Sequence, residues 1–245
     1  LYLVMTGVFS FVVTNLVFPR LSRTNAAEDK DASRALVAGA LKAVTIVILP
    51  IMVCFILLSE DVIGIIYEHG LFTREQTLIT AAALSCYSVG MIGLAYNEVL
   101  SKSFFSMKNS RTPLVTALLS MAANIAMAYI FYGRLSAAGL ALATAGGSTV
   151  NAVLNLIAYR RSCGRIFTSA DMREVLKLIL CAAVMCAAVA AVAAALRGRV
   201  PAGLVGYIVH GAVCGAVGLV VYFGAALAVG VDSIKNALGG IFGEK

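Results

Sequence analysis

Seven long apolar stretches, separated by short polar segments, dominate this sequence. They cover residues 1–19, 35–58, 77–101, 112–132, 137–159, 174–196 and 202–230. A helix needs about 20 mostly apolar residues to cross the hydrocarbon core of a membrane. The strands of an outer-membrane barrel would instead alternate apolar and polar residues. The pattern therefore predicts an all-α, polytopic membrane protein with seven transmembrane helices.

Composition supports this class and leaves no room for a large soluble domain. Hydrophobic residues make up 61% of the chain and charged residues only 13%, which is about half the usual share in a soluble domain. The six cysteines show no CxxC motif and no Cys/His spacing of the kind that binds a metal.

Basic residues indicate how the helices are oriented, because Lys and Arg collect in loops that stay in the cytoplasm. Among the 19 basic residues, those in the even-numbered loops are only Arg74, Arg134, Arg197 and Arg199. The odd-numbered loops are therefore predicted to be cytoplasmic, with the amino terminus outside and the carboxyl terminus inside. The net charge of +7 is then a topology signal, and no basic soluble face remains to bind a nucleic acid.

The first residues predict that a longer protein surrounds this chain. Leu1 lies inside an apolar stretch, with neither an initiator Met nor a flanking charge before it. Transporters are commonly built from paired repeats, so an odd number of helices suggests that some are absent. We expect the chain to be a fragment whose earlier half is missing.

Polar side chains form stripes on two consecutive apolar stretches. The residues concerned are Thr112, Thr116, Ser120 and Asn124 on one stretch, and Thr144, Ser148, Asn151 and Asn155 on the next. At 3.6 residues per turn, each set lies along one face of its helix. Two interpretations stay open: the side chains hydrogen-bond neighbouring helices together, or they line a polar pathway.

The end of stretch 77–101 is also unusually polar, since Asn97, Glu98, Ser101 and Lys102 lie within six residues. Glu98 and Lys102 are four residues apart with the acid first, the better order for an ion pair on a helix. Lys102 either extends to the cytoplasmic interface, with Glu98 as its counter-charge, or faces a cavity, as ionisable groups inside a membrane usually do.

The last two stretches differ from the others because neither carries a polar stripe. Stretch 202–230 contains His210, followed by Gly211 and Gly215 in GxxxG spacing. Small residues at this spacing let helices approach closely. We expect the two helices to pack tightly together outside the polar core. For His210, a place at an interface or in helix packing is favoured over the alternative role of proton carrier.

Two motifs have direct structural interpretations. In DVIGIIYEHGLFT, apolar residues recur at helical spacing before Gly70, which can adopt the left-handed conformation that ends a helix. This predicts a short amphipathic helix on the outer surface, with an apolar face formed by Val62, Ile63, Ile66 and Tyr67. In NSRTP, Thr112 is expected to cap a helix and Pro113 to occupy its first turn. Arg111 is then either a topology anchor or a contact for a lipid headgroup.

A resemblance to a known family rests on four segments and their order along the chain: NLVFPRLSR, DVIGIIYEHGLFTREQT, ALSCYSVGMIGLAYNEVLSKSFFSMKNSRTP and AAGLALATA. Residues 1 to about 160 resemble the carboxyl-terminal half of the lipid II flippases of the MurJ/MviN type, in the MOP exporter superfamily. The resemblance implies fourteen helices, of which this chain would hold the last seven. Residues 1–160 would form the second transporter lobe, and residues 161–245 two peripheral helices with a groove for the lipid tail, plus a short tail.

The resemblance also implies a function. Members of this family turn undecaprenyl-linked peptidoglycan precursor from the cytoplasmic to the external leaflet of the bacterial inner membrane, by alternating access between two lobes. The chain would then be part of a transporter and not an enzyme. Its partners would be the lipid-linked precursor, membrane lipids and the missing amino-terminal lobe. No cofactor is implied, and coupling to Na⁺ or H⁺ stays open.

The candidate substrate-binding residues are Lys102, Glu98, Asn97, Asn151, Asn155 and Arg111. Lys102 matches a position where relatives often carry a basic residue, and in a cavity it would attract the pyrophosphate of the substrate. Asn124 and Thr144 match positions that could ligate sodium in relatives. Such a site would want a carboxylate one turn after Asn124, where this chain has Ala128, and this departure weakens the sodium prediction.

Other functions remain as alternatives. A sibling exporter could carry other polyprenyl-linked oligosaccharides or drugs, although the order of motifs favours the flippase. A membrane-embedded polyprenyl-phosphate transferase would need paired carboxylates for Mg²⁺, and the fifth loop offers only Asp171 and Glu174. An assembly scaffold would need no polar stripes inside its helices.

Overall fold

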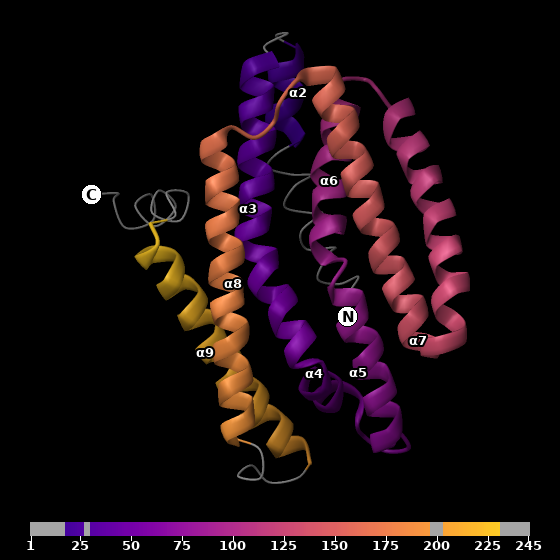
Figure 1. Cartoon of the computed structure of the whole chain (residues 1–245), viewed down its shortest axis with the longest axis vertical. Helices are drawn as coiled ribbons and strands as arrows, with labels where there is room; N and C mark the ends of the chain where they lie inside the picture. The colour runs from indigo at the N-terminus through magenta and orange to yellow at the C-terminus, as the bar shows by residue number, and fades with distance from the viewer. Residues whose placement is uncertain (1–17, 27–29, 197–202, 231–245) are drawn as a thin grey trace. The chain divides into compact units, whose positions relative to one another are not determined.

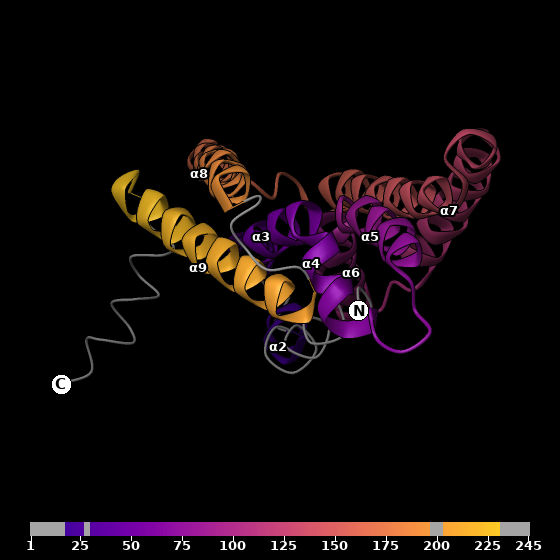
Figure 2. The same cartoon turned by 90° about the horizontal axis from the view of Figure 1, so that it is seen from below.

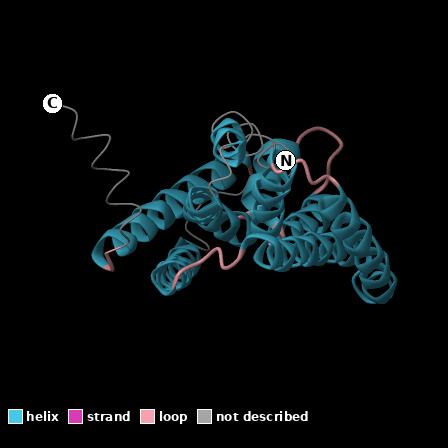
Figure 3. Cartoon of the chain, turned by 90° about the horizontal axis from the view of Figure 1, so that it is seen from above, coloured by secondary structure: helices cyan, strands magenta, loops and turns pink. Residues whose placement is uncertain are grey.

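The computed structural model describes residues 18–26, 30–196 and 203–230. Its helices are α2 (Phe18–Ala26), α3 (Lys30–Leu57), α4 (Ser59–Tyr67), α5 (Arg74–Ser88), α6 (Met91–Ser106), α7 (Arg111–Cys163), α8 (Ser169–Leu196) and α9 (Leu204–Ala228), which Figure 1 follows along the chain. The described residues contain no strand, as Figure 3 shows. The predicted all-α class is therefore confirmed.

The apolar stretches form helices that are long enough to cross a membrane. Among the described residues there are five such helices, or six when α5 and α6 count as one bent span. The spans are Asp31–Leu57, the pair Arg74–Ser88 and Met91–Ser106, Arg111–Gly133, Leu135–Cys163, Ser169–Leu196 and Leu204–Ala228. They correspond to the second to seventh predicted stretches. The first stretch, 1–19, lies almost wholly outside the described residues.

Two compact units make up the chain, and each is described by itself. Unit 1 comprises residues Leu1–Ile48 and Cys86–Asp171, and unit 2 comprises Leu49–Ser85 and Met172–Lys245. The division within α3 falls beside Pro50, which lies inside this helix. Proline has no backbone N–H, so it removes one hydrogen bond from the helix at this point.

In unit 1, α6 packs closely against α7 because two glycines let the backbones approach. A Cβ atom at Gly90 would lie 2.5 Å from the Cα of Ala145, and one at Gly93 would lie 2.9 Å from the Cα of Thr149. α7 consists of two helical arms that meet near Ser136, whose φ of 51° is not helical. Figure 1 shows α7 folding back on itself at this point.

A capping motif begins α8. The backbone N–H and the hydroxyl of Thr168 donate to the Oδ2 atom of Asp171, at 2.8 and 2.7 Å. The Nζ atom of Lys42, from α3, donates to the other oxygen of the same carboxylate at 2.7 Å. Both oxygens of Asp171 are therefore engaged in structural contacts, which leaves this residue poorly placed to hold the Mg²⁺ of a transferase.

In unit 2, α4 packs against the amino end of α9, as Figure 2 shows. A Cβ atom at Gly64 would lie 2.6 Å from the ring of Tyr207, and one at Gly211 would lie 3.3 Å from the Cβ of Asp61. Each glycine thus makes room for a side chain of the opposite helix. The expected close contact between α8 and α9 does not run through Gly211 and Gly215, because Gly211 faces α4 and nothing lies within 4 Å of a Cβ at Gly215. The two helices meet at Gly218 instead, where a Cβ would lie 2.9 Å from the side chains of Met185 and Val189.

The predicted short helix is present as α4, but its buried face differs from the prediction. Asp61, Ile63 and Gly64 are buried, whereas Ile66 and Tyr67 are 44% and 46% exposed. The close fit of Gly64 against Tyr207 determines which face of α4 turns towards α9. The pattern of hydrophobic residues does not show this contact. α4 ends at Tyr67, and Gly70 adopts its positive φ of 63° in the turn that follows.

The start of α7 departs in one detail from the expected capping. The Oδ1 atom of Asn109 accepts the backbone N–H of Thr112 at 3.2 Å, and its amide donates to the Thr112 hydroxyl at 2.9 Å. Asn109 therefore caps this helix in place of Thr112, because its side chain lies one turn earlier. Pro113 lies in the first turn, where its missing N–H leaves no hydrogen bond unmade.

Candidate functional site

The polar stripes meet inside unit 1 at Asn155, which is completely buried. Its amide nitrogen donates to the Oδ1 atoms of Asn97 at 2.6 Å and of Asn151 at 3.3 Å. Its Oδ1 atom accepts the hydroxyl of Thr116 at 2.8 Å. The network continues to Ser101, whose hydroxyl donates to Asn97 at 3.3 Å. One side chain thus joins α6 to both arms of α7.

Burial gives Asn155 a structural role. An amide taken out of water destabilises the protein unless its hydrogen bonds are made, and Asn155 makes three of them to neighbouring side chains. Thr116 is also buried, whereas Asn97 and Asn151 are half-buried. Of the two interpretations of the stripes, hydrogen bonding between helices accounts for Asn155 and Thr116. Asn97 and Asn151 lie at the edge of this network.

The predicted ion pair of α6 is present. The Nζ atom of Lys102 lies 3.8 Å from the Oε1 atom of Glu98, and their side chains are 28% and 32% exposed. This separation is an ionic contact and exceeds hydrogen-bond length. Glu98 directly follows Asn97 in the sequence, so the charged pair and the amide network share the same two turns of helix.

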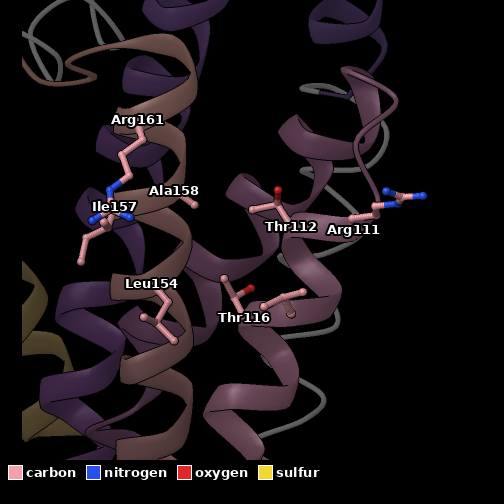
Figure 4. A pocket seen from close by; sticks show the side chains of 8 residues that line it. Arg111, Thr112, Thr116, Leu154, Ile157, Ala158 and Arg161 are labelled. Carbon is pink, nitrogen blue, oxygen red and sulfur yellow. The ribbon is translucent and has the colours of Figure 1, made fainter.

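A pocket of about 350 Å³ lies between the two arms of α7. Its lining residues are Arg111, Thr112, Val115, Thr116, Leu154, Ile157, Ala158 and Arg161. Figure 4 shows that the side chain of Arg111 extends away from the arm that carries Arg161, so the two guanidinium groups do not converge. Thr116 belongs both to this pocket and to the amide network. The pocket is therefore mainly apolar, with basic groups at its rim.

The remaining hydroxyls of the stripes bond mostly within their own helices. Thr144 donates to the carbonyl of Leu140 at 3.0 Å, and Ser120 donates to that of Ala117 at 2.9 Å. Ser148 donates to Ala145 at 2.9 Å and makes a longer contact of 3.4 Å with the carbonyl of Gly90 on α6. These residues satisfy their hydroxyls locally, as Ser and Thr in helices commonly do.

The residues that could hold sodium do not fit such an ion. Asn124 packs against Gly147, where an added Cβ would lie 2.9 Å from the Cβ of Asn124. Thr144 directs its hydroxyl to the carbonyl of its own helix. The next turn after Asn124 offers Ala128 instead of a carboxylate, and a hard cation needs oxygen ligands. Within the described ranges, no three His, Cys, Asp or Glu residues gather as a metal site would require.

Several contacts were not predicted from the sequence. The hydroxyl of Thr45 on α3 lies 2.7 Å from that of Tyr96 on α6. In unit 2, the imidazole of His210 lies 2.7 Å from the carboxylate of Asp61, which comes 149 residues earlier. Nothing local in the sequence indicates either of these two contacts. The close approach of α6 and α7 was also not predicted, although the small residues Gly90 and Gly93 could have indicated it.

The apolar spans and the amide network inside the bundle define a multi-pass, all-α membrane protein, the class that includes membrane transporters. A family model described as "Lipid II flippase MurJ" matches residues 1–210. The chain belongs to this family.

Individual relatives agree with this assignment. The chain is 33% identical over 143 residues to the lipid II flippase MurJ of Thermosipho africanus, covering 58% of this chain and 29% of that protein. It is 25% identical over 190 residues to the probable lipid II flippase MurJ of Rhizobium meliloti, covering 77% and 35%. A solved structure of lipid II flippase MurJ in an inward closed conformation matches 95% of this chain and 46% of its own length, with a TM-score of 0.76 and 26% identity. The chain thus spans about a third of these curated relatives and just under half of the solved flippase.

Proposed function

We propose that this chain forms part of a flippase that moves lipid II, the lipid-linked peptidoglycan precursor, from the inner to the outer leaflet of the bacterial cytoplasmic membrane. The observation that carries the proposal is the family match over residues 1–210. The fold match to a solved flippase, at a TM-score of 0.76, supports it independently. Alternating access between two lobes is the mechanism that this fold suggests.

The proposed division of the chain into a transporter lobe and two peripheral helices follows the distribution of polar residues. Residues 1–160 would form a transporter lobe and residues 161–245 two peripheral helices. In support, the amide network and the Glu98–Lys102 pair both lie before residue 160. Apolar side chains dominate the exposed surface of α8, for example Leu176, Leu180 and Val184, as expected for helices that contact lipid tails.

Within the lobe, Lys102 is the proposed contact for the pyrophosphate of the substrate. Its side chain is 28% exposed, so it is not sealed inside the helix bundle. Glu98, at 3.8 Å, limits the directions in which the lysine extends and leaves its three donors largely unused. Arg111 would contact headgroups at the rim of the α7 pocket.

The asparagines have a different proposed role. Asn155 is buried and hydrogen-bonded, so it would hold α6 and α7 in register and not touch the substrate. Asn97 and Asn151 are half-buried and would complete the polar lining beside Lys102. Asn97 also connects this lining to the network through its contact with Asn155 at 2.6 Å.

Complementation tests the proposed function. The complete gene product would be expressed in bacteria whose own lipid II flippase can be depleted. Rescue of growth, together with lipid II that becomes accessible to an external probe, is expected. No rescue of growth and no external lipid II would contradict the proposal, and the appearance of a different polyprenyl-linked oligosaccharide outside the cell would indicate one of the sibling exporters.

A further inference from the structure

Charged side chains gather in unit 2, where α4 and the first residue of α5 meet the amino end of α9. The cluster lies on the side predicted to be external, and none of its residues belongs to the network around Asn155. Its members are Glu60, Asp61, Glu68, Arg74, Tyr207 and His210.

The central contact joins His210 to Asp61. The Nδ1 atom of His210 lies 2.7 Å from the Oδ2 atom of Asp61, and the two side chains are only 21% and 11% exposed. Gly211 has no side chain, so α9 approaches until a Cβ there would lie 3.3 Å from that of Asp61. The other ring nitrogen, Nε2, faces the sulfur of Cys214 at 3.9 Å. The hydrogen bond to Asp61 is therefore the stronger of the two contacts that the imidazole of His210 makes.

A second set of contacts surrounds this pair. The guanidinium of Arg74 donates to Glu60 and to the hydroxyl of Tyr207, and lies 3.7 Å from Glu68. The hydroxyl of Tyr207 in turn donates to Glu68 at 3.0 Å. The ring of Tyr207 fills the space that Gly64 leaves open. Both sets of contacts hold the same end of α9 against α4 and the start of α5.

The charges in this cluster do not balance. Three carboxylates, from Glu60, Asp61 and Glu68, face one guanidinium, from Arg74. A cluster with this excess of negative charge attracts a further positive charge. Burial raises the pKa of Asp61, although its hydrogen bond to His210 opposes this shift. A hydrogen bond from Thr77, with another from Tyr207 and the charge of Arg74, lowers the pKa of Glu68 and keeps it ionised.

We propose that Asp61 and His210 form a proton-binding site, and that proton uptake by His210 tightens the hold of α4 on the amino end of α9. Histidine is the side chain that normally changes its charge between about pH 5 and 8. With neutral histidine, an ordinary N–H donates to the carboxylate. With imidazolium, the same 2.7 Å contact becomes a charge-assisted hydrogen bond, which is roughly twice as strong.

Among the side chains of this cluster, histidine is the type that ordinarily changes its charge in this range. Thiol and phenol groups such as those of Cys214 and Tyr207 generally keep their protons there, and arginine stays charged. Glu60 and Glu68 are held by Arg74. Acidification of the external side would therefore act on this contact through one histidine.

Hydrogen exchange tests the proposal on the complete protein in lipid nanodiscs. Amide exchange in the segment Leu204–Gly211 would be followed by mass spectrometry from pH 8 to pH 5, after correction for the chemical exchange rate. Protection of this segment should rise about fivefold in acid, the effect of making one hydrogen bond charge-assisted. His210→Gln should abolish the rise. His69→Gln should retain it, because His69 is the other of the two histidines and is exposed.

A direct titration covers the case in which His210→Gln fails to fold. This chain has two histidines, so the ¹⁵N-histidine label is confined to this part of the complete protein by segmental labelling, and its two imidazole signals are assigned by comparison with His69→Gln. The proposal fails if His210 keeps one protonation state from pH 5 to 8, or if His210→Gln shows the same acid-induced protection as the unmodified protein. Neither measurement involves transport, so its failure would leave the proposed flippase function standing.

Discussion

Asn155 shows how a single polar residue can organise helices inside a membrane. Thr116, Asn151 and Asn155 were recognised in the sequence by their helical spacing, since a stripe can be counted along the chain. Asn97 was recognised by the polar group that ends stretch 77–101. The spacing does not reveal that the Thr116 hydroxyl and the Asn97 amide oxygen both meet Asn155, because partners on other helices depend on tertiary packing. The sequence therefore indicated the polar faces and left their role open.

Replacing Asn155 by leucine is expected to destabilise the protein. The change removes three hydrogen bonds, each of which contributes about 0.5–1.5 kcal/mol. Thr116 keeps its bond to the carbonyl of Pro113, and Asn97 keeps the one from Ser101, so the loss is that of the contacts between the helices. Thermal unfolding in detergent and the amount of protein in the membrane measure the loss. Asn151→Leu is the matched control: this half-buried amide accepts one contact of 3.3 Å, so stability should change little while transport falls. Normal accumulation of Asn155→Leu would refute the structural role.

Lys102 separates substrate binding from anchoring. If Lys102 attracts pyrophosphate, Lys102→Gln should lower transport at least tenfold with unchanged protein level, since a charge-assisted contact contributes about 1.5–3 kcal/mol. Lys102→Arg should keep most of the activity, because the charge remains. The measurement is external lipid II in the complementation assay, normalised to protein in the membrane. Near-normal transport by Lys102→Gln would leave Lys102 as an interfacial anchor only.

The raised pKa of Asp61 makes a prediction about stability and pH. Burial disfavours its carboxylate, so folding favours the protonated form. Protonation of Asp61 therefore contributes to the stability of the fold, and this contribution is complete below the ordinary pKa of a carboxyl group, about 4. The contribution is lost as the pH rises through the raised pKa of Asp61. Asp61→Asn keeps an acceptor for His210 and removes the buried charge. Its melting temperature should match or exceed that of the unmodified protein at neutral pH and vary less in acid. A clear loss of stability at pH 7 would show instead that the ion pair outweighs the burial of the charge.

At the scale of helices and their contacts, glycine positions decided what hydrophobicity could not. The apolar residues of α4 predicted a helix, and the helix is there. Their pattern did not show that Gly64 would face α9, because the deciding factor is the shape of Tyr207 on a helix 140 residues away in sequence. GxxxG spacing at Gly211 likewise indicated a close approach, but not that α4 is the helix that approaches. A glycine in the sequence indicates that another helix can approach closely at that position, but it does not identify which helix or side chain does so.

Gly64→Ala tests the close fit between Gly64 and the ring of Tyr207. The added methyl group would lie 2.6 Å from the ring of Tyr207, so the ring must move and its hydrogen bond to Glu68 at 3.0 Å weakens. Overpacking of this kind destabilises by about 1–3 kcal/mol, measured as a lowered melting temperature. Gly39→Ala in α3 is the control, because nothing lies within 4 Å of the new Cβ and alanine favours a helix by up to about 1 kcal/mol. Equal effects of the two substitutions would contradict the close fit.

At the scale of the whole molecule, the spans were predictable because the membrane imposes its own length on a helix. Six predicted stretches and the observed spans agree to within a few residues at most of their ends. The exceptions have local causes: α5 and α6 are interrupted at Val89 and Gly90, and Pro50 interrupts the hydrogen bonding of α3 beside the division between the two units. Division into units depends on packing among helices, for which the apolar pattern carries no signal.

Orientation in the membrane is the last property predicted from the sequence that an experiment can decide. Basic residues place the loop after α4 outside and the loop after α7 inside. Leu71 is 98% exposed in the first of these loops, and Ser162 is exposed at the end of α7, so a cysteine at either position should be accessible to reagent. With the native cysteines replaced, Leu71→Cys should react with a membrane-impermeant maleimide added to intact spheroplasts, and Ser162→Cys should react only after permeabilisation. The reverse pattern would invert the topology, and would place the Asp61–His210 pair at the cytoplasmic face, where external acid could not reach it.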